Sequence, residues 1–202
     1  MADTQVRPSK ADRTRAKLRA AAIEAIADRG YHGTTTRDIA SGAGLSTAAL
    51  YVYYASKEEL LYAIAKDGHD DTLAIVRAAQ SSSDRPTEQL ASFVAAFVAY
   101  HAREHTSAII INRELAALDA EHRTEIGSFR DEIESTLEGM LRAGVHAGDF
   151  DIADTRMTLI ALLSLGLDVA RWYRDGGEWT PDDVARYYTE LALRMVGARR
   201  DQ

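Results

Sequence analysis

One stretch, residues 34–60, decides the fold: TTTRDIASGAGLSTAALYVYYASKEEL. Thr35 is followed three residues later by Asp38, which is the spacing of a capping box, so a helix is predicted to begin here. Gly42 and Gly44 then interrupt the helical pattern, and glycine adopts the positive φ angle that a tight turn between helices requires. The stretch therefore begins with a helix that ends in a tight turn.

A second, shorter helix is predicted over residues 47–53, with Ser46 as its N-cap. It carries small side chains first and tyrosines behind them. Small side chains let a helix end approach base edges in the major groove, and tyrosine hydroxyls can reach the flanking phosphates. Ser56 with Glu59 repeats the capping pattern and predicts the start of a third, longer helix. These elements together predict a helix-turn-helix module.

Four segments of this stretch resemble the TetR family of bacterial transcription regulators in their order and spacing. They are residues 34–40, 44–46, 50–54 and 56–60. The resemblance extends at the level of motifs over about residues 12 to 65, and the rest of the chain agrees in length and helical pattern. It implies three helices for DNA, a helical body for ligand binding and dimerisation, and a fourth helix that joins the two parts.

The resemblance also implies which side chains meet an operator in double-stranded DNA. Phosphate contacts are expected from Thr36, Tyr51, Tyr53 and Lys57. Base contacts are expected from Arg37 and from the start of the second short helix, and Val52 offers an apolar contact to a thymine methyl group. The full predicted set is Thr35, Thr36, Arg37, Ser46, Thr47, Ala48, Ala49, Tyr51, Val52, Tyr53 and Lys57.

The composition favours an all-α protein of about nine helices. The three prolines of the 202-residue chain lie near predicted helix boundaries, and Ala, Leu, Glu and Arg are abundant. We expect a disordered tail at residues 1–9, the helix-turn-helix domain at 10–55, and a ligand-binding and dimerisation domain at 56–202. The N-terminus lacks the apolar core of a signal peptide, and the most apolar run, residues 157–169, is too short to span a membrane. We therefore expect a cytoplasmic protein.

The charge of the chain is divided unevenly. Residues 1–57 hold nine Lys and Arg against five Asp and Glu, a balance of +4, and the remainder holds 15 against 26, a balance of −11. A basic N-terminal module on an acidic body is expected when one end of a protein meets phosphate. There is no cysteine, which excludes disulfides, thiolate metal sites and a cysteine nucleophile.

A pocket for a small-molecule inducer is predicted among the body helices, because apolar stripes there carry a few polar residues. Its expected lining is Phe93, Phe97, His101, Ile110, Asn112, Arg113, Leu137, Met140 and Leu163. This mixture suits a largely apolar ligand. Residues 170–177 resemble TetR-like regulators of fatty-acid and steroid catabolism, several of which respond to acyl-CoA thioesters. An acyl-CoA, a fatty acid and a steroid-like molecule are therefore the candidates, and no cofactor is expected.

A homodimer is predicted, since one short recognition helix buries too little surface for tight specific binding to a pseudo-palindromic operator. The resemblance puts the contact on the last two long helices, and residues 155–173 are apolar on more sides than one protomer needs. The expected interface residues are Leu162, Val169, Val184, Tyr188, Leu191 and Met195.

Two other interpretations compete with a ligand-responsive repressor. His101, Glu104 and His105 match the H-x-x-E-H pattern of a zinc hydrolase, in which two histidines on one helix face hold the metal and the glutamate acts as base. That pattern has few fixed positions and lacks an evident third ligand. A helical adaptor without DNA binding is the other alternative, against which the intact set around Arg37 and Lys57 argues. The polar segment 66–71 is interpreted as a solvated helix face, and no metal site is expected.

Overall fold

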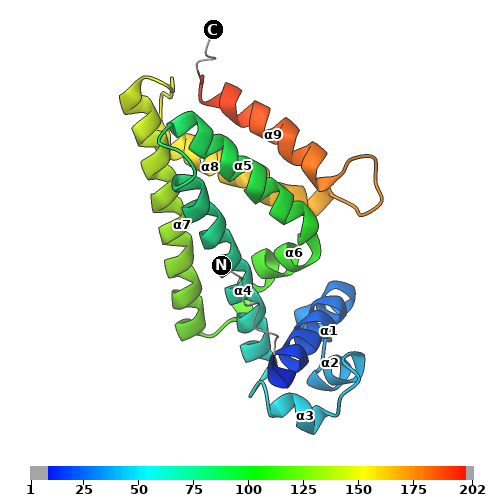
Figure 1. Ribbon diagram of the computed structural model, residues 1–202. Helices are drawn as coiled ribbons and strands as arrows, with labels where there is room; N and C mark the ends of the chain where they lie inside the picture. The colour runs from blue at the N-terminus through cyan, green and yellow to red at the C-terminus, as the bar shows by residue number, and fades with distance from the viewer. Residues whose placement is uncertain (1–8, 199–202) are drawn as a thin grey trace, which may run out of the picture.

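The computed structural model describes residues 9–198, whose regular structure is entirely helical. Within this part of the chain the order is α1 (Lys10–Gly33), α2 (Thr36–Gly42), α3 (Thr47–Tyr51), α4 (Lys57–Gln80), α5 (Pro86–Arg103), α6 (His105–Glu114), the 3₁₀ helix η1 (Leu115–Ala117), α7 (Ala120–Ala147), α8 (Thr155–Trp172) and α9 (Pro181–Met195). Helices α1 to α3 form a small unit at one end, and α4 runs from it into the body (Figure 1). The predicted all-α class with about nine helices is confirmed for the described residues.

Local capping explains where most helices begin. Thr35 and Asp38 form the predicted capping box of α2: the Asp38 carboxylate accepts from the Thr35 N–H at 2.9 Å, and the Thr35 hydroxyl oxygen accepts from the Asp38 N–H at 3.2 Å. Thr180 and Asp183 form the same box at α9, where Pro181 occupies the first helical position. Gly44 has φ +69° in the turn before α3, the positive value expected for that turn.

Several predicted boundaries differ from the structure. Residues 1–8 of the expected tail lie outside the described residues, but Ser9 caps α1, where its side chain accepts from the Asp12 N–H. Helix α3, the predicted recognition helix, ends at Tyr51, two residues before the predicted end. The carboxylate of Glu59 accepts from the N–H of Ala55, so the second capping box is not reciprocal. Sequence periodicity alone does not show such one- or two-residue changes.

The first core joins α1 to α3 to the start of α4. Leu18, Ile39 and Leu50 are fully buried there against Leu60 and Leu61 of α4. This core also takes in the end of α6 and the start of α7. Helix α4 therefore belongs to both parts of the molecule, and the domain division at residue 55 stays a prediction about folding units.

The second core fills the body around α5, which packs against α4, α7, α8 and α9 (Figure 1). Phe97 of α5 lies directly on the backbone of α8 at Gly166, where an added Cβ would meet its ring at 2.4 Å. Phe150 packs in the same way on Gly144 of α7. These glycines let helices approach closely and fix the space left between them. In the part of the chain that the structure describes, no helix has the length and apolar character needed to cross a membrane.

Candidate DNA-binding surface and ligand cavity

The recognition helix α3 presents a surface of the predicted composition. Ser46 caps it, accepting from the Ala49 N–H at 3.1 Å, while Leu50 is buried beneath it. On the outer side Val52 is 77% exposed and Tyr51 is 52% exposed. The Tyr51 hydroxyl lies 3.3 Å from the Thr36 hydroxyl, which links α3 to the start of α2. The exposed Val52 side chain is suited to contact a base, and the hydroxyls of Tyr51 and Thr36 are suited to contact phosphates.

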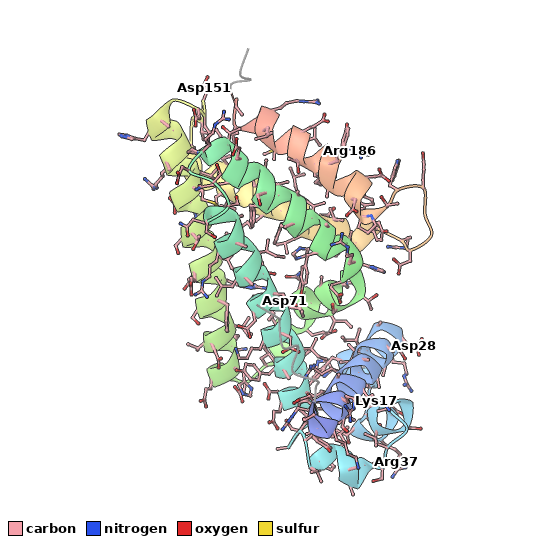
Figure 2. All side chains as sticks on the ribbon, in the orientation of Figure 1. Lys17, Asp28, Arg37, Asp71, Asp151 and Arg186 are labelled. Atoms are coloured by element: carbon pink, nitrogen blue, oxygen red, sulfur yellow. The ribbon has the colours of Figure 1, made fainter. Side chains whose placement is uncertain are left out.

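The cationic residues predicted to contact DNA differ in exposure: Arg37 is exposed, whereas Lys57 is hydrogen-bonded within the protein. Arg37 points outward from the end of the molecule that carries α3 (Figure 2). Lys57 is instead half-buried: its Nζ donates to the carbonyl oxygens of Tyr31 at 2.7 Å and Thr34 at 2.8 Å. The same ammonium lies 4.1 Å from the centroid of the Tyr31 ring. Lys57 thus ties the start of α4 to the end of α1, and its predicted phosphate contact would use the remaining N–H.

The remaining predicted DNA residues lie on the same unit. Thr35, Ser46 and Ala48 are exposed, and Thr36, Thr47, Ala49 and Tyr53 are half-buried. The guanidinium of Arg15 on α1 lies 5.6 Å from the centroid of the Tyr53 ring. The structure therefore brings all eleven predicted side chains to the unit formed by α1, α2, α3 and the start of α4.

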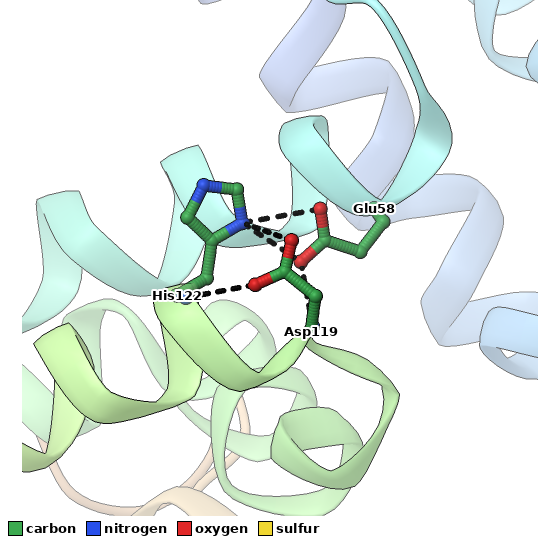
Figure 3. Close-up of side chains that lie close together, drawn as sticks. All are labelled: Glu58, Asp119 and His122. Atoms are coloured by element: carbon green, nitrogen blue, oxygen red, sulfur yellow. Dashed lines mark hydrogen bonds and ion pairs between the residues drawn. The ribbon is translucent and has the colours of Figure 1, made fainter.

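A polar cluster connects this unit to the body (Figure 3). Glu58, in the first turn of α4, accepts from the backbone N–H of Asp119 at 3.0 Å and lies 2.9 Å from Nδ1 of His122. Asp119 caps α7, and the Tyr62 ring stacks on the imidazole with centroids 3.7 Å apart. These three side chains are close enough to hold an ion, yet they already bond to one another. We interpret them as a contact that fixes α4 against α7.

This contact predicts a pH-dependent stability. The hydrogen bond to the Glu58 carboxylate raises the pKa of His122 above its usual 6.5. A group whose pKa is raised by folding stabilises the folded state while it is protonated, and this contribution is lost as the pH rises through the folded-state value. In the Glu58→Gln variant, proton NMR titration is expected to show the His122 pKa falling toward the ordinary value. The gain in unfolding free energy of the wild type over the variant should be larger at about pH 6 than at about pH 8. An unchanged His122 titration in the variant would contradict this assignment.

A cavity of about 160 Å³ lies inside the body, lined by five helices. Apolar side chains make up much of its wall: Phe97, Ala108, Ile111, Ile133, Leu163 and Leu167. Its polar lining is His69, Thr72, Tyr100, His101, Asn112, Arg130 and Glu134. An apolar wall with a few polar groups is the general character of a small-molecule site.

The structure places the nine predicted pocket residues in three settings. Phe97, His101, Asn112 and Leu163 line the cavity. Ile110 and Arg113 line a separate groove between α6 and α1. Phe93, Leu137 and Met140 are buried in the second core, at 0 to 2% exposure, and line none of these spaces. Helical spacing alone does not distinguish a core position from a cavity position.

The sequence interpretation missed the contribution of α4 to the cavity, and on α7 it named Leu137 and Met140 in place of Arg130, Ile133 and Glu134. His69 was placed on a solvated face, which is wrong, because its side chain is 8% exposed and Nδ1 lies 2.7 Å from the Ala65 carbonyl oxygen. Gly68 also faces the cavity, since an added Cβ would meet the Ile111 Cδ1 at 2.7 Å. The adjacent Gly68 and His69, inside an otherwise charged segment, could have indicated that this part of α4 faces the interior. No comparable feature of the sequence distinguishes Arg130 from the other charged residues of α7.

A second space adjoins the cavity at the surface between α6 and α8. Asn112 and Leu167 line both the cavity and an opening of about 280 Å³, whose rim carries Arg113 and Arg171. Arg113 in turn lines a groove of about 380 Å³ between α6 and α1, with Arg174 beside it. The apolar cavity thus lies beside a surface that carries three arginines and is bounded on one side by α1.

Comparison with known proteins identifies the family. Two protein-family models match the chain. The family of bacterial regulatory proteins, tetR family, matches residues 18–64, and the family of tetracyclin repressor-like C-terminal domains matches residues 83–196. The chain belongs to the TetR family. It is 31% identical over 182 residues to the HTH-type transcriptional repressor KstR2 of Rhodococcus jostii, covering 89% of each chain.

Two solved structures agree with this TetR-family assignment. A tetR-family regulatory protein from Rhodococcus RHA1 superposes with a TM-score of 0.86 at 40% identity, covering 96% of this chain and 100% of the other. The regulator AibR, in complex with isovaleryl coenzyme A and operator DNA, superposes with a TM-score of 0.80 at 26% identity, covering 93% and 100%. This TetR-family protein is therefore a ligand-responsive transcriptional regulator that binds operator DNA as a homodimer.

The zinc-hydrolase alternative is not supported in this TetR-family protein. Helix α5 ends at Arg103, Glu104 has non-helical angles, and His105 begins α6, so the two histidines do not share a helix face. His101 is 4% exposed with Nδ1 2.8 Å from the Phe97 carbonyl oxygen, and burial lowers its pKa to about 4. A neutral imidazole whose Nδ1 donates to its own helix is a core histidine.

The predicted dimer residues of the TetR-family chain also fall into two groups. Leu162, Val169 and Val184 are at most 5% exposed inside the protomer, which leaves them little surface to offer a partner. Met195 is exposed, and Tyr188 and Leu191 are half-buried. Other large apolar side chains are exposed on the same two helices: Met157, Ile160, Leu165, Trp172 and Tyr187. Exposed apolar residues on both α8 and α9 are typical of a surface that associates.

Proposed function

We propose that this protein is a repressor that leaves its operator when it binds a short-chain acyl-CoA thioester. The observation that carries the proposal is that the apolar cavity shares Asn112 and Leu167 with a surface opening lined by Arg113 and Arg171, while Arg174 lines the adjoining groove. An acyl-CoA has the complementary division, with an apolar acyl group at one end and phosphates at the other. Arginine is well suited to phosphate because its planar fork donates two parallel hydrogen bonds.

The volume of the cavity favours a short acyl group. An apolar protein cavity of about 150 Å³ accommodates benzene, and the cavity here measures about 160 Å³. A group of about six carbons is therefore the size that the resting conformation can take without moving its walls. A steroid nucleus is larger than this space. AibR, whose structure contains isovaleryl coenzyme A, supports the same class of ligand by similarity.

The position of the groove between α6 and α1 suggests how a bound ligand would weaken operator binding. Ile26, Ala27 and Gly30 of α1 form one side of it, and α6 forms the other. A nucleotide lying in this groove would contact the DNA-binding unit and the body together, and would favour one separation between them. A ligand shifts such an equilibrium by its differential affinity for the two arrangements. A differential of about 3 kcal/mol lowers operator affinity by roughly a hundredfold.

The test is a fluorescence-anisotropy titration of the operator complex with hexanoyl-CoA, with free CoA and hexanoate as half-molecule controls. Hexanoyl-CoA is expected to release the operator at a concentration that leaves both halves without effect. Gly68→Leu should bind the operator normally and resist release, because its side chain would occupy the cavity. Gly139→Leu, where an added Cβ meets nothing within 4 Å, is the matched control. Release by free CoA alone, or an unchanged response in Gly68→Leu, would contradict the proposal.

We further propose that the dimer forms through apolar residues of α8 and α9, around Met157, Ile160, Tyr187, Leu191 and Met195. The exposure of four of these side chains and the partial exposure of Leu191 support it. The cytoplasm is the compartment in which such a regulator reaches the chromosome, and the proposal includes that location. It also includes the absence of catalysis, since the family consists of regulators and the histidine pair does not share a helix face.

A further inference from the structure

We propose that the cavity selects acyl groups that carry an oxygen acceptor of their own, with a carboxylate as the strongest, and that Arg130 is the residue that recognises it. This inference rests on the proposed function and defines its ligand more narrowly. It follows from the polar groups of the cavity and from the partners that each of them already has.

Most polar side chains of the cavity are already bonded to the protein. The Thr72 hydroxyl donates to the Gly68 carbonyl oxygen at 2.8 Å, and the Tyr100 hydroxyl donates to Asp71 at 3.3 Å. The Glu134 carboxylate forms an ion pair with Arg156 at 2.8 Å. These groups shape the cavity but have little need of a ligand.

Arg130 is different. Its Nε donates to Nε2 of His69 at 3.1 Å, and one Nη donates to the Asn112 side-chain oxygen at 3.2 Å. A guanidinium has five N–H groups, so three remain without an acceptor among residues 9–198. Within the same residues Arg130 forms no ion pair, and burial lowers the pKa of its guanidinium. The cavity therefore holds a partly desolvated cation without a direct ion pair, because the nearby Glu134 carboxylate, which favours the charged guanidinium, is itself paired with Arg156.

The partners of Arg130 hold it in place without removing its charge. Because Nδ1 of His69 donates to the Ala65 carbonyl oxygen, Nε2 is the acceptor, and the imidazole is neutral. Burial lowers the pKa of His69, which favours the same neutral state. The Asn112 amide nitrogen donates to the Ala108 carbonyl oxygen at 2.9 Å, which directs its oxygen toward Arg130. His69 and Asn112 are positioning residues for the guanidinium.

A ligand that enters this space with a purely hydrocarbon acyl group would cover the cation without giving it an acceptor, which is unfavourable. An acyl group with a hydroxyl or carbonyl oxygen would supply a hydrogen bond, and a carboxylate would also neutralise the charge through a bidentate pair. Selectivity of this kind is strong because a buried donor left unpaired costs more than one extra methylene gains. The chemistry of the cavity thus favours oxygenated over plain acyl groups.

The experiment compares thioesters of equal chain length in operator release: hexanoyl-CoA, 6-hydroxyhexanoyl-CoA, 3-hydroxyhexanoyl-CoA and adipoyl-CoA, the last ending in a carboxylate. At least one oxygenated thioester is expected to release the wild type at about a tenfold lower concentration than hexanoyl-CoA. In Arg130→Leu this advantage should fall to within about threefold. Arg123→Leu removes an exposed arginine from the same helix and should keep the wild-type ranking. Thermal unfolding of each variant confirms that it is folded.

Two results overturn the inference while leaving the proposed function intact. One is equal release by all four thioesters in the wild type, and the other is an advantage that persists in Arg130→Leu. A second measurement does not depend on CoA: hexanoate should raise the Tm of the wild type more than hexanamide does, and Arg130→Leu should show no such difference. If no thioester releases the operator, the proposed function fails. The inference then depends on this Tm comparison, and equal shifts in the wild type would overturn it.

Discussion

Leu191→Arg is expected to produce a monomer that binds the operator about a thousandfold more weakly than the wild-type dimer. Leu191 is half-buried on α9, between the exposed Tyr187 and Met195. In a two-fold interface the same surface meets itself, so one substitution introduces a charge on both sides of the contact. The loss should be large because a protomer with one short recognition helix keeps only one half-site. Specific binding exceeds non-specific binding by about a thousandfold or more.

The measurement combines light scattering for the oligomeric state with anisotropy for operator affinity. Ser135→Arg, which adds the same charge at an exposed position of α7, is the control and should stay dimeric. Circular dichroism establishes that Leu191→Arg is still helical. A stable dimer with unchanged affinity in that variant would move the interface away from α9.

The helices and their starting points could be predicted because the information for them is local. Thr35 with Asp38, and Thr180 with Asp183, form capping boxes whose atoms lie within four residues of one another. The turn at Gly44 depends on one backbone angle. Residues within one helix turn determine these features, so a single sequence is enough to locate them.

The cavity could be predicted only in part, because it depends on which helix faces meet. Phe93 and Phe97 lie on the same apolar stripe of α5, but only Phe97 reaches the cavity, where the absence of a side chain at Gly166 lets its ring lie on α8. Arg130 and His69 are 61 positions apart in sequence and bond to each other only once α4 and α7 have packed. The dimer surface depends on the same kind of information, because apolar periodicity on α8 does not show whether Val169, which is buried in its own protomer, faces that core or a partner.

The DNA surface yields a prediction with two separable parts. Lys57→Ala should weaken binding to all sequences and lower the salt slope of binding by about one unit, since it removes one phosphate contact. Arg37→Ala should instead change sequence preference, at about 1–3 kcal/mol if the side chain makes a bidentate base contact. Arg37 is exposed at the end of the molecule that carries α3 (Figure 2). Lys57 instead donates hydrogen bonds to two carbonyl oxygens. Anisotropy titrations at several salt concentrations, on operator and scrambled DNA, measure both effects.

The structure makes a control necessary for Lys57, because its ammonium also ties α4 to the end of α1. Loss of these two hydrogen bonds would lower the unfolding temperature without changing the salt dependence of operator affinity. Loss of a phosphate contact would change that salt dependence. Lys66→Ala removes a lysine of the same helix that pairs with Asp70 at 2.9 Å, and should change neither the salt slope nor the sequence preference. Tyr51→Phe combined with Lys57→Ala removes a hydroxyl and an ammonium from the predicted phosphate contacts together. Unchanged operator affinity of this double variant at every salt concentration would show that DNA approaches a different surface.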